Sequence, residues 1–157
     1  MVNFKNILFP VDMSESALAV VPFVQSIAGL YESDIHLLYV ARSVEYLSVI
    51  QIEAPTLVSF NSELFDSAQK SLAEFKEAHF GNREYIKTAV ILGYPSEEIL
   101  GYVARKNIDL VIMGTHGRRG LEKVLFGSVA EQVVKTSPAP VLVINPHKVK
   151  LPTVEAF

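Results

Sequence analysis

The sequence contains no cysteine among its 157 residues. This absence excludes disulfide bonds, thiolate nucleophiles and every zinc site that needs a cysteine ligand. It fits a reducing compartment, so we expect a cytoplasmic protein.

The sequence also lacks a basic surplus and a long apolar run. Lys and Arg number 14 against 17 Asp and Glu, a formal net charge of −3, which argues against a nucleic-acid binder that neutralises phosphates. The longest stretch without charge, residues 16–31, is shorter than the ~20 apolar residues of a membrane span. The apolar run in residues 1–11 is too short for a signal peptide. We therefore expect a soluble protein with no membrane contact.

Five short apolar runs recur along the chain, at residues 7–11, 35–40, 85–91, 110–113 and 141–144. Four are nearly continuous Ile, Leu, Val or Phe, which is typical of strands covered on both faces in a parallel sheet. The run 85–91 alternates, with Lys87 and Thr88 interleaved, and predicts a half-exposed edge strand.

Helical spacing of apolar residues fills the segments between these runs. One helix is expected over residues 14–30, with Pro22 kinking it, and another over residues 64–75, with Gly81 as its C-cap. Two more are expected from Pro95 and from Gly127-Ser128. The order βαβαβαβαβ predicts an open α/β sheet in a single domain, residues 1–146. Residues 42–61 are expected to be a variable loop and 147–157 a C-terminal tail.

Glycines after the fourth run follow the spacing Gly-x2-Gly-x9-Gly-Ser, from Gly114 and Gly117 to Gly127 and Ser128. Glycines let backbone N–H groups approach an anion, and a helix N-terminus adds free donors and a positive dipole end. The pattern therefore predicts an anion site, although the residues alone equally permit a glycine-rich turn before an ordinary capped helix. Neither a P-loop nor a dinucleotide-binding glycine motif is present.

Taken with other segments, this spacing resembles the universal stress protein family, whose ATP-binding pattern it matches. The resemblance covers nearly the whole chain, and its main departures are the 42–61 insert and Pro22. It implies a five-stranded parallel sheet in the order 3-2-1-4-5, Rossmann-like and similar to the adenine nucleotide alpha hydrolases. The other segments that carry the resemblance are Ile7-Leu8-Phe9-Pro10-Val11-Asp12, Leu38-Tyr39-Val40, Gly93-Tyr94-Pro95, Asp109-Leu110-Val111-Ile112-Met113-Gly114 and Ser137-Pro138-Ala139-Pro140-Val141-Leu142-Val143-Ile144.

The resemblance also implies site residues for ATP, AMP or ADP with Mg²⁺ or Mn²⁺. Asp12 would contact the ribose or a phosphate-bound metal ion, although with Glu15 it also fits a capping box for the first helix. His116 is expected to contact the nucleotide but to make no metal site of its own. The remaining implied contacts are Pro10, Val11 and Val40 around the adenine, Met113 and Gly114 beneath the ligand, and Gly117, Arg118, Gly127, Ser128 and Val129 around the phosphates.

Three functions stay open on the sequence. The first is an ATP-binding regulatory module in a stress response, with an unknown protein partner and no catalytic residues. The second is a slow ATPase or adenine-nucleotide hydrolase in the same pocket, since a fold does not determine function. The third is a nucleotide-free interaction protein.

The last apolar run also predicts a homodimer. Pro138 and Pro140 frame its start, and proline in a strand suits only a sheet edge. An apolar edge is an aggregation hazard unless something covers it, and a two-fold copy would offer the same strand back. We expect the strands from Val141 to Ile144 of two chains to pair antiparallel or to pack together, unless the C-terminal tail covers its own edge.

Overall fold

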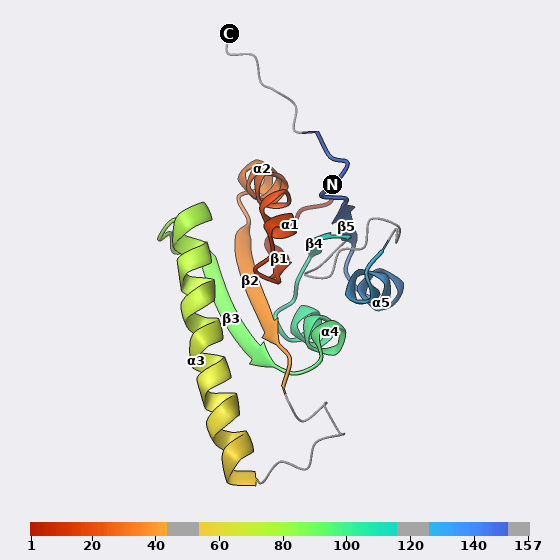
Figure 1. Ribbon diagram of the computed structural model, residues 1–157. Coiled ribbons are helices and arrows are strands. Elements are labelled where there is room, and N and C mark those ends of the chain that lie inside the picture. Colours follow the sequence, from red (N-terminus) through yellow and green to blue (C-terminus); the bar gives the residue numbers. More distant parts are fainter. Residues whose placement is uncertain (44–53, 116–125, 151–157) are drawn as a thin grey trace.

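The computed structural model describes residues 1–43, 54–115 and 126–150 (Figure 1). Its five strands form one parallel sheet in the order β3-β2-β1-β4-β5, as expected. Each strand coincides with one of the predicted apolar runs to within a residue or so at its ends. The strands are β1 (Asn6–Val11), β2 (Asp34–Ala41), β3 (Ile86–Leu92), β4 (Leu110–Gly114) and β5 (Val141–Ile144); the helices are α1 (Glu15–Leu18), α2 (Val21–Tyr31), α3 (Ala54–His79), α4 (Pro95–Arg105) and α5 (Ser128–Thr136).

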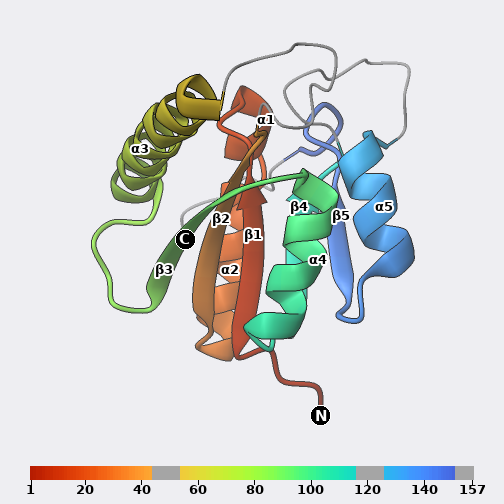
Figure 2. The ribbon, with the colours of Figure 1, turned by 90° about the horizontal axis from the view of Figure 1, so that it is seen from below.

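Helices cover both faces of the sheet, because alternate side chains of each strand point to opposite sides. On one face Ile7 and Phe9 of β1 pack with Val24 of α2 and Leu72 of α3. On the other face Leu8 packs in a second cluster, with residues of α4 and α5. Figure 2 shows α4 and α5 on one side of the sheet and α2 on the other. None of the described helices is long and apolar enough to cross a membrane.

The first predicted helix is in fact two helices, so the expectation of one kinked helix is wrong. Helix α1 ends at Leu18 and α2 begins at Val21. Pro22 therefore lies in the first turn of α2, where a missing N–H group costs nothing because that group has no intrahelical partner. Helix α2 ends at Tyr31, and its C-cap Glu32 takes the left-handed conformation with φ 52°.

Helix α3 is longer than the apolar spacing predicted. It begins at Ala54, so residues 54–61 of the expected loop are helical, and residues 44–53 lie outside the described part of the chain. Its end matches the prediction for Gly81, which has φ +72° and donates its N–H to the carbonyl of Lys76 at 3.0 Å.

Strand β3 lies at an edge of the sheet, as the alternating run predicted. Lys87 and Thr88 are exposed, and the Lys87 ammonium lies 2.6 Å from the carboxylate of Asp34 on β2. A charged side chain on an edge strand discourages pairing with another chain.

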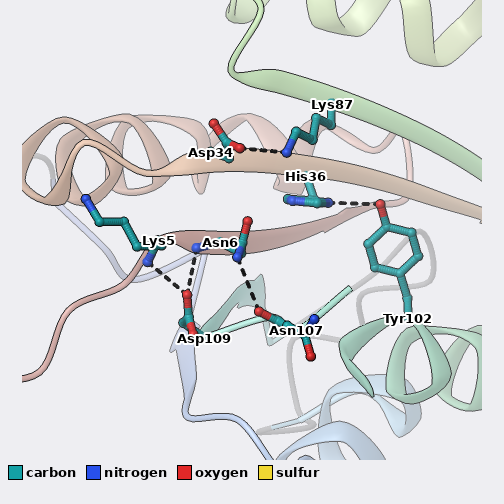
Figure 3. Close-up of polar contacts among 8 residues, drawn as sticks. All are labelled: Lys5, Asn6, Asp34, His36, Lys87, Tyr102, Asn107 and Asp109. Atoms are coloured by element: carbon teal, nitrogen blue, oxygen red, sulfur yellow. Dashed lines mark hydrogen bonds and ion pairs between the residues drawn. The ribbon is translucent and has the colours of Figure 1, made fainter. Parts of the chain in front are cut away.

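A buried polar pair joins the sheet to α4. His36 of β2 is 4% exposed, and its Nδ1 lies 3.0 Å from the hydroxyl of Tyr102 (Figure 3). Within the described chain, Nε2 of His36 is buried without a hydrogen-bond partner. Burial lowers the pKa of His36, the nearby cations Lys87 and Lys106 lower it further, and the Asp34 carboxylate opposes them. The imidazole is therefore held neutral in the folded state.

This pair predicts acid-sensitive stability. The folded pKa of His36 lies below the unfolded value of about 6.5, so the unfolded chain binds more protons as the pH falls through that value. The free energy of unfolding should fall from about pH 7 downward, with a contribution of at most ~1.4 kcal/mol per pH unit from this one site. Urea unfolding at pH 7.5 and 5.5 should show a smaller pH dependence for His36→Gln than for the wild type. His147→Gln, at an exposed position, is the control; an equal pH dependence in all three proteins would contradict the assignment.

Candidate functional site

The candidate site lies at the carboxyl edge of the sheet between β1 and β4. The chain runs from β1 outward to β3 and then crosses back to β4 on the other side of β1. In open α/β sheets, ligands bind outside the carboxyl ends of the strands where the order reverses in this way. In Figure 2 these ends lie at the top, where α1 and α5 begin.

The two central strands are joined tightly at their amino ends only. Strands β1 and β4 share two registered pairs, Ile7 with Leu110 and Leu8 with Val111, whereas β1 and β2 share six. At the amino ends, Oδ2 of Asp109 accepts backbone N–H groups of Lys5 at 2.9 Å and Asn6 at 2.8 Å (Figure 3). Because the ladder stops early, the strands are free to diverge toward the carboxyl edge, where a ligand needs room.

Asp12 follows β1 directly, and its carboxylate is held in place by the next turn. Oδ1 accepts the backbone N–H of Ser14 at 3.0 Å and its hydroxyl at 2.6 Å. Met13 between them has φ 60°, an uncommon conformation for a residue other than glycine. The capping box proposed for Asp12 and Glu15 does not form, since α1 has Ser14 as its N-cap without a side-chain cap bond.

The N-terminus of α5 lies next to the end of β4. Thr115 donates its N–H to the carbonyl of Ile144 at 2.9 Å, and its own carbonyl accepts the N–H of Gly127 at 2.6 Å. Gly127 is the extended N-cap of α5, with no side-chain cap bond. The N–H groups of the first helical turn, beginning with Ser128 and Val129, have no intrahelical partner and carry the positive end of the helix dipole. This arrangement is suited to an anion.

The residues expected near the adenine lie at the same edge, but they differ in whether their side chains are accessible to a ligand. Val11 is buried in the cluster that packs under α1, α2 and α3 with Ile7 and Phe9, called here the α1–α3 cluster. Met113 is buried with Leu8 in the cluster under α4 and α5 on the other face of the sheet, the α4–α5 cluster. Pro10 and Val40 are half-buried. Ligand contacts from Val11 and Met113 would therefore come through their backbone. Gly114 ends β4, while His116, Gly117 and Arg118 lie outside the described residues.

Sequence reasoning missed a groove between the first turns of α4 and α5. The groove has a volume of about 430 Å³ and runs beside Ser128, with Tyr94, Ser96, Glu97 and Glu131 among its lining residues. The predicted order of strands and helices places the first turns of both helices at the carboxyl edge, and this was the signal in the sequence that could have indicated a groove between them. The carboxylate of Glu131 accepts a 2.6 Å hydrogen bond from the ammonium of Lys135, and this bond lowers the pKa of Glu131. The carboxylates of Glu97 and Glu131 disfavour an anion in the part of the groove that they line. Within the described residues no group of three or more His, Cys, Asp or Glu could hold a metal ion.

Comparison with known proteins gives consistent matches. A family model described as the universal stress protein family matches residues 3–145. Universal stress protein MJ0531 of Methanocaldococcus jannaschii is 32% identical over 146 residues, covering 92% of this chain and 84% of that protein. MJ0577 of the same organism is 29% identical over 156 residues, covering 92% and 96%.

Solved structures agree with the fold. The structure of MJ0577 has a TM-score of 0.80 at 31% identity, with 92% of this chain and 97% of that chain covered. Universal stress protein UspA from Lactobacillus plantarum has a TM-score of 0.75 at 26% identity, with 92% and 100% covered. A universal stress protein solved in complex with cAMP shares the fold, with a TM-score of 0.59 at 16% identity and 92% and 99% covered.

The turn at Asp12 predicts a difference between two substitutions. Asp12→Ala removes both bonds to Ser14 and should lower the free energy of unfolding by about 1 kcal/mol. Asp12→Asn keeps an oxygen acceptor and should stay within ~0.5 kcal/mol of the wild type. Urea denaturation measures both, with Asp66→Ala at an exposed position of α3 as the control. If Asp12→Ala loses no more stability than Asp66→Ala, the side chain of Asp12 does not hold the turn.

Proposed function

The chain belongs to the universal stress protein family, and from this premise we propose that it is a regulatory module that binds an adenine nucleotide, ATP or its AMP or ADP forms, at the carboxyl edge. The observation that carries the proposal is the hydrogen bond between Gly127 and Thr115, which fixes the open N-terminus of α5 against the end of β4. Occupancy of this site would change what the protein contacts in a stress response. Backbone donors at the start of α5 and the positioned carboxylate of Asp12 support binding of a nucleotide at this edge.

The nucleotide would lie across the switch between β1 and β4. Its phosphates would accept the N–H groups of Ser128 and Val129, whereas the N–H of Gly127 is already donated to the carbonyl of Thr115, so Gly127 would serve as the N-cap that leaves room for the phosphates. Gly117 and Arg118 would also contact the phosphates. Pro10, Val11 and Val40 would lie around the adenine, Met113 and Gly114 beneath the ligand, and His116 would contact the nucleotide. Asp12, already oriented by Ser14, would hold the ribose or a Mg²⁺ or Mn²⁺ ion on the phosphates. The cAMP complex of a protein with the same fold supports an adenine nucleotide as the ligand class.

Titration calorimetry of nucleotide-free protein with ATP tests this proposal. With Mg²⁺ present, Asp12→Asn should weaken binding about tenfold, because one carboxylate contact to the metal is lost, whereas without metal its effect should be small. Asp66→Asn should bind as the wild type does. No binding at millimolar ATP would rule the proposal out. Hydrolysis that depends on Asp12 would instead favour the slow-ATPase alternative.

We further propose that the protein is a cytoplasmic homodimer joined through β5. Strand β5 pairs with β4 on one side only. Leu142 on β5 is 37% exposed and Val134 on α5 is 44% exposed, so large apolar side chains are exposed near this edge on both faces of the sheet. Val149 of the tail packs against the α1–α3 cluster, yet Leu142 stays exposed beside it. A second copy would cover this edge by presenting the same strand.

Light scattering of edge variants tests the dimer. Val143→Lys and Leu142→Lys should each give a folded monomer, because a charge in the apolar seam opposes burial. Leu30→Lys, at an exposed apolar position on α2, should leave the dimer mass unchanged. If the β5 variants also keep the dimer mass, the interface lies elsewhere on the molecule.

A further inference from the structure

A second cavity lies at the opposite, amino edge of the sheet. It has a volume of about 640 Å³ and is formed where α2 and α3 end and where the chain enters β2 and β3. Among its lining residues, the side-chain amide of Gln25 on α2 donates to the carbonyl of His79 at the end of α3 at 2.7 Å and so joins the two helices. Its volume falls within the range of about 300–1,000 Å³ that is typical of sites for small organic molecules.

The inner lining of this cavity is apolar. Ala28, Ile35, Phe80 and Ile86 line it and are all buried. These side chains come from α2, from β2, from the residue after α3 and from β3, so packing in the hydrophobic core holds them in place. Each of the four exposes 6% of its surface or less, so a small aliphatic group would contact them only as the floor of the cavity and would be covered mainly by the side chains of its rim.

Gly29 of α2 also lines the cavity, and nothing in the described structure requires a glycine at this position. A Cβ built on Gly29 would meet no atom within 4 Å, and Gly29 does not have a positive φ. Neither close packing against the described residues nor backbone conformation therefore requires glycine, which weakens a helix interior relative to alanine. A bound molecule that approaches the helix backbone would account for it.

Two side chains of opposite charge line the same cavity. Glu32 follows the end of α2, and Arg83 precedes β3, where its guanidinium donates to the Tyr85 hydroxyl. The carbonyl of Tyr85 accepts the N–H of Ile35 at 2.8 Å, so the segments that carry the two charges enter paired strands. Among the described residues, neither Glu32 nor Arg83 has an ion-pair partner.

We infer that this cavity binds a free α-amino acid with an apolar side chain. The ligand carboxylate would pair with Arg83, whose planar guanidinium matches that geometry. The ligand ammonium would lie toward Glu32 and the carbonyl-rich ends of α2 and α3, where the helix dipoles favour a cation. The ligand side chain would rest on Phe80 and Ile86. This inference is independent of nucleotide binding, because the cavity lies at the other edge of the sheet.

Titration calorimetry with L-leucine tests the inference on the full chain. Leucine should bind with saturation below about 10 mM, whereas 3-methylbutylamine and 4-methylpentanoic acid, which each lack one charged group, should bind at least about tenfold more weakly. Arg83→Gln should weaken leucine binding about tenfold and leave the amine unaffected. Glu32→Gln should weaken leucine binding and leave the acid unaffected.

Matched controls distinguish these contacts from a general loss of charge. Glu84→Gln and Lys70→Gln alter exposed residues outside the cavity lining and should bind leucine as the wild type does. Circular dichroism verifies that each variant is folded. The inference is overturned if leucine fails to bind at 10 mM, if the two analogues bind as tightly as leucine, or if Arg83→Gln and Glu84→Gln behave alike.

Discussion

Strand β1 has to be covered on both faces, since Ile7, Leu8 and Phe9 are apolar, fully buried and alternate between the two sides. Helices must therefore lie on both sides of the sheet, and the chain must cross from one side to the other. It does so after β3, when α4 carries it back past β1 to β4. The place where a ligand can enter follows from that crossing, because the connections on either side of β1 leave in opposite directions.

The two edges of the sheet differ in the backbone groups that the helix ends leave unpaired. In a parallel sheet with crossover helices, every helix begins at the carboxyl edge and ends at the amino edge. Donor N–H groups therefore gather near Gly127 and Ser128, and acceptor carbonyls gather near Glu32 and Gly81. The two edges are suited to ligands of opposite charge as a consequence of topology, before any side chain is considered.

The strands could be predicted from the sequence because burial on both faces leaves continuous apolar runs, and the order of the strands came from the family resemblance. The division of the first helix was missed because apolar spacing continues through Ala19 and Val20, and only the backbone at Pro22 reveals the break. The candidate carboxyl-edge site could be proposed from the sequence because one local glycine pattern points to it, and its role in binding stays a prediction. The groove beside Tyr94 and the cavity at Gly29 were not, because their linings come from segments far apart in the chain and share no motif.

The bond between Asp109 and the backbone of Asn6 also bears on how the chain folds. It joins residues that are 103 positions apart, so it closes most of the domain into one loop. The entropy lost in such a closure must be offset by contacts made at the same time, which places β1–β4 pairing after the local βα units in any folding sequence. The half of the domain containing β1, β2 and β3 has shorter-range contacts and can assemble first. Nascent chains would thus expose the β4-facing edge of β1 until about two thirds of the sequence had been synthesised, a period in which that edge is open to wrong partners.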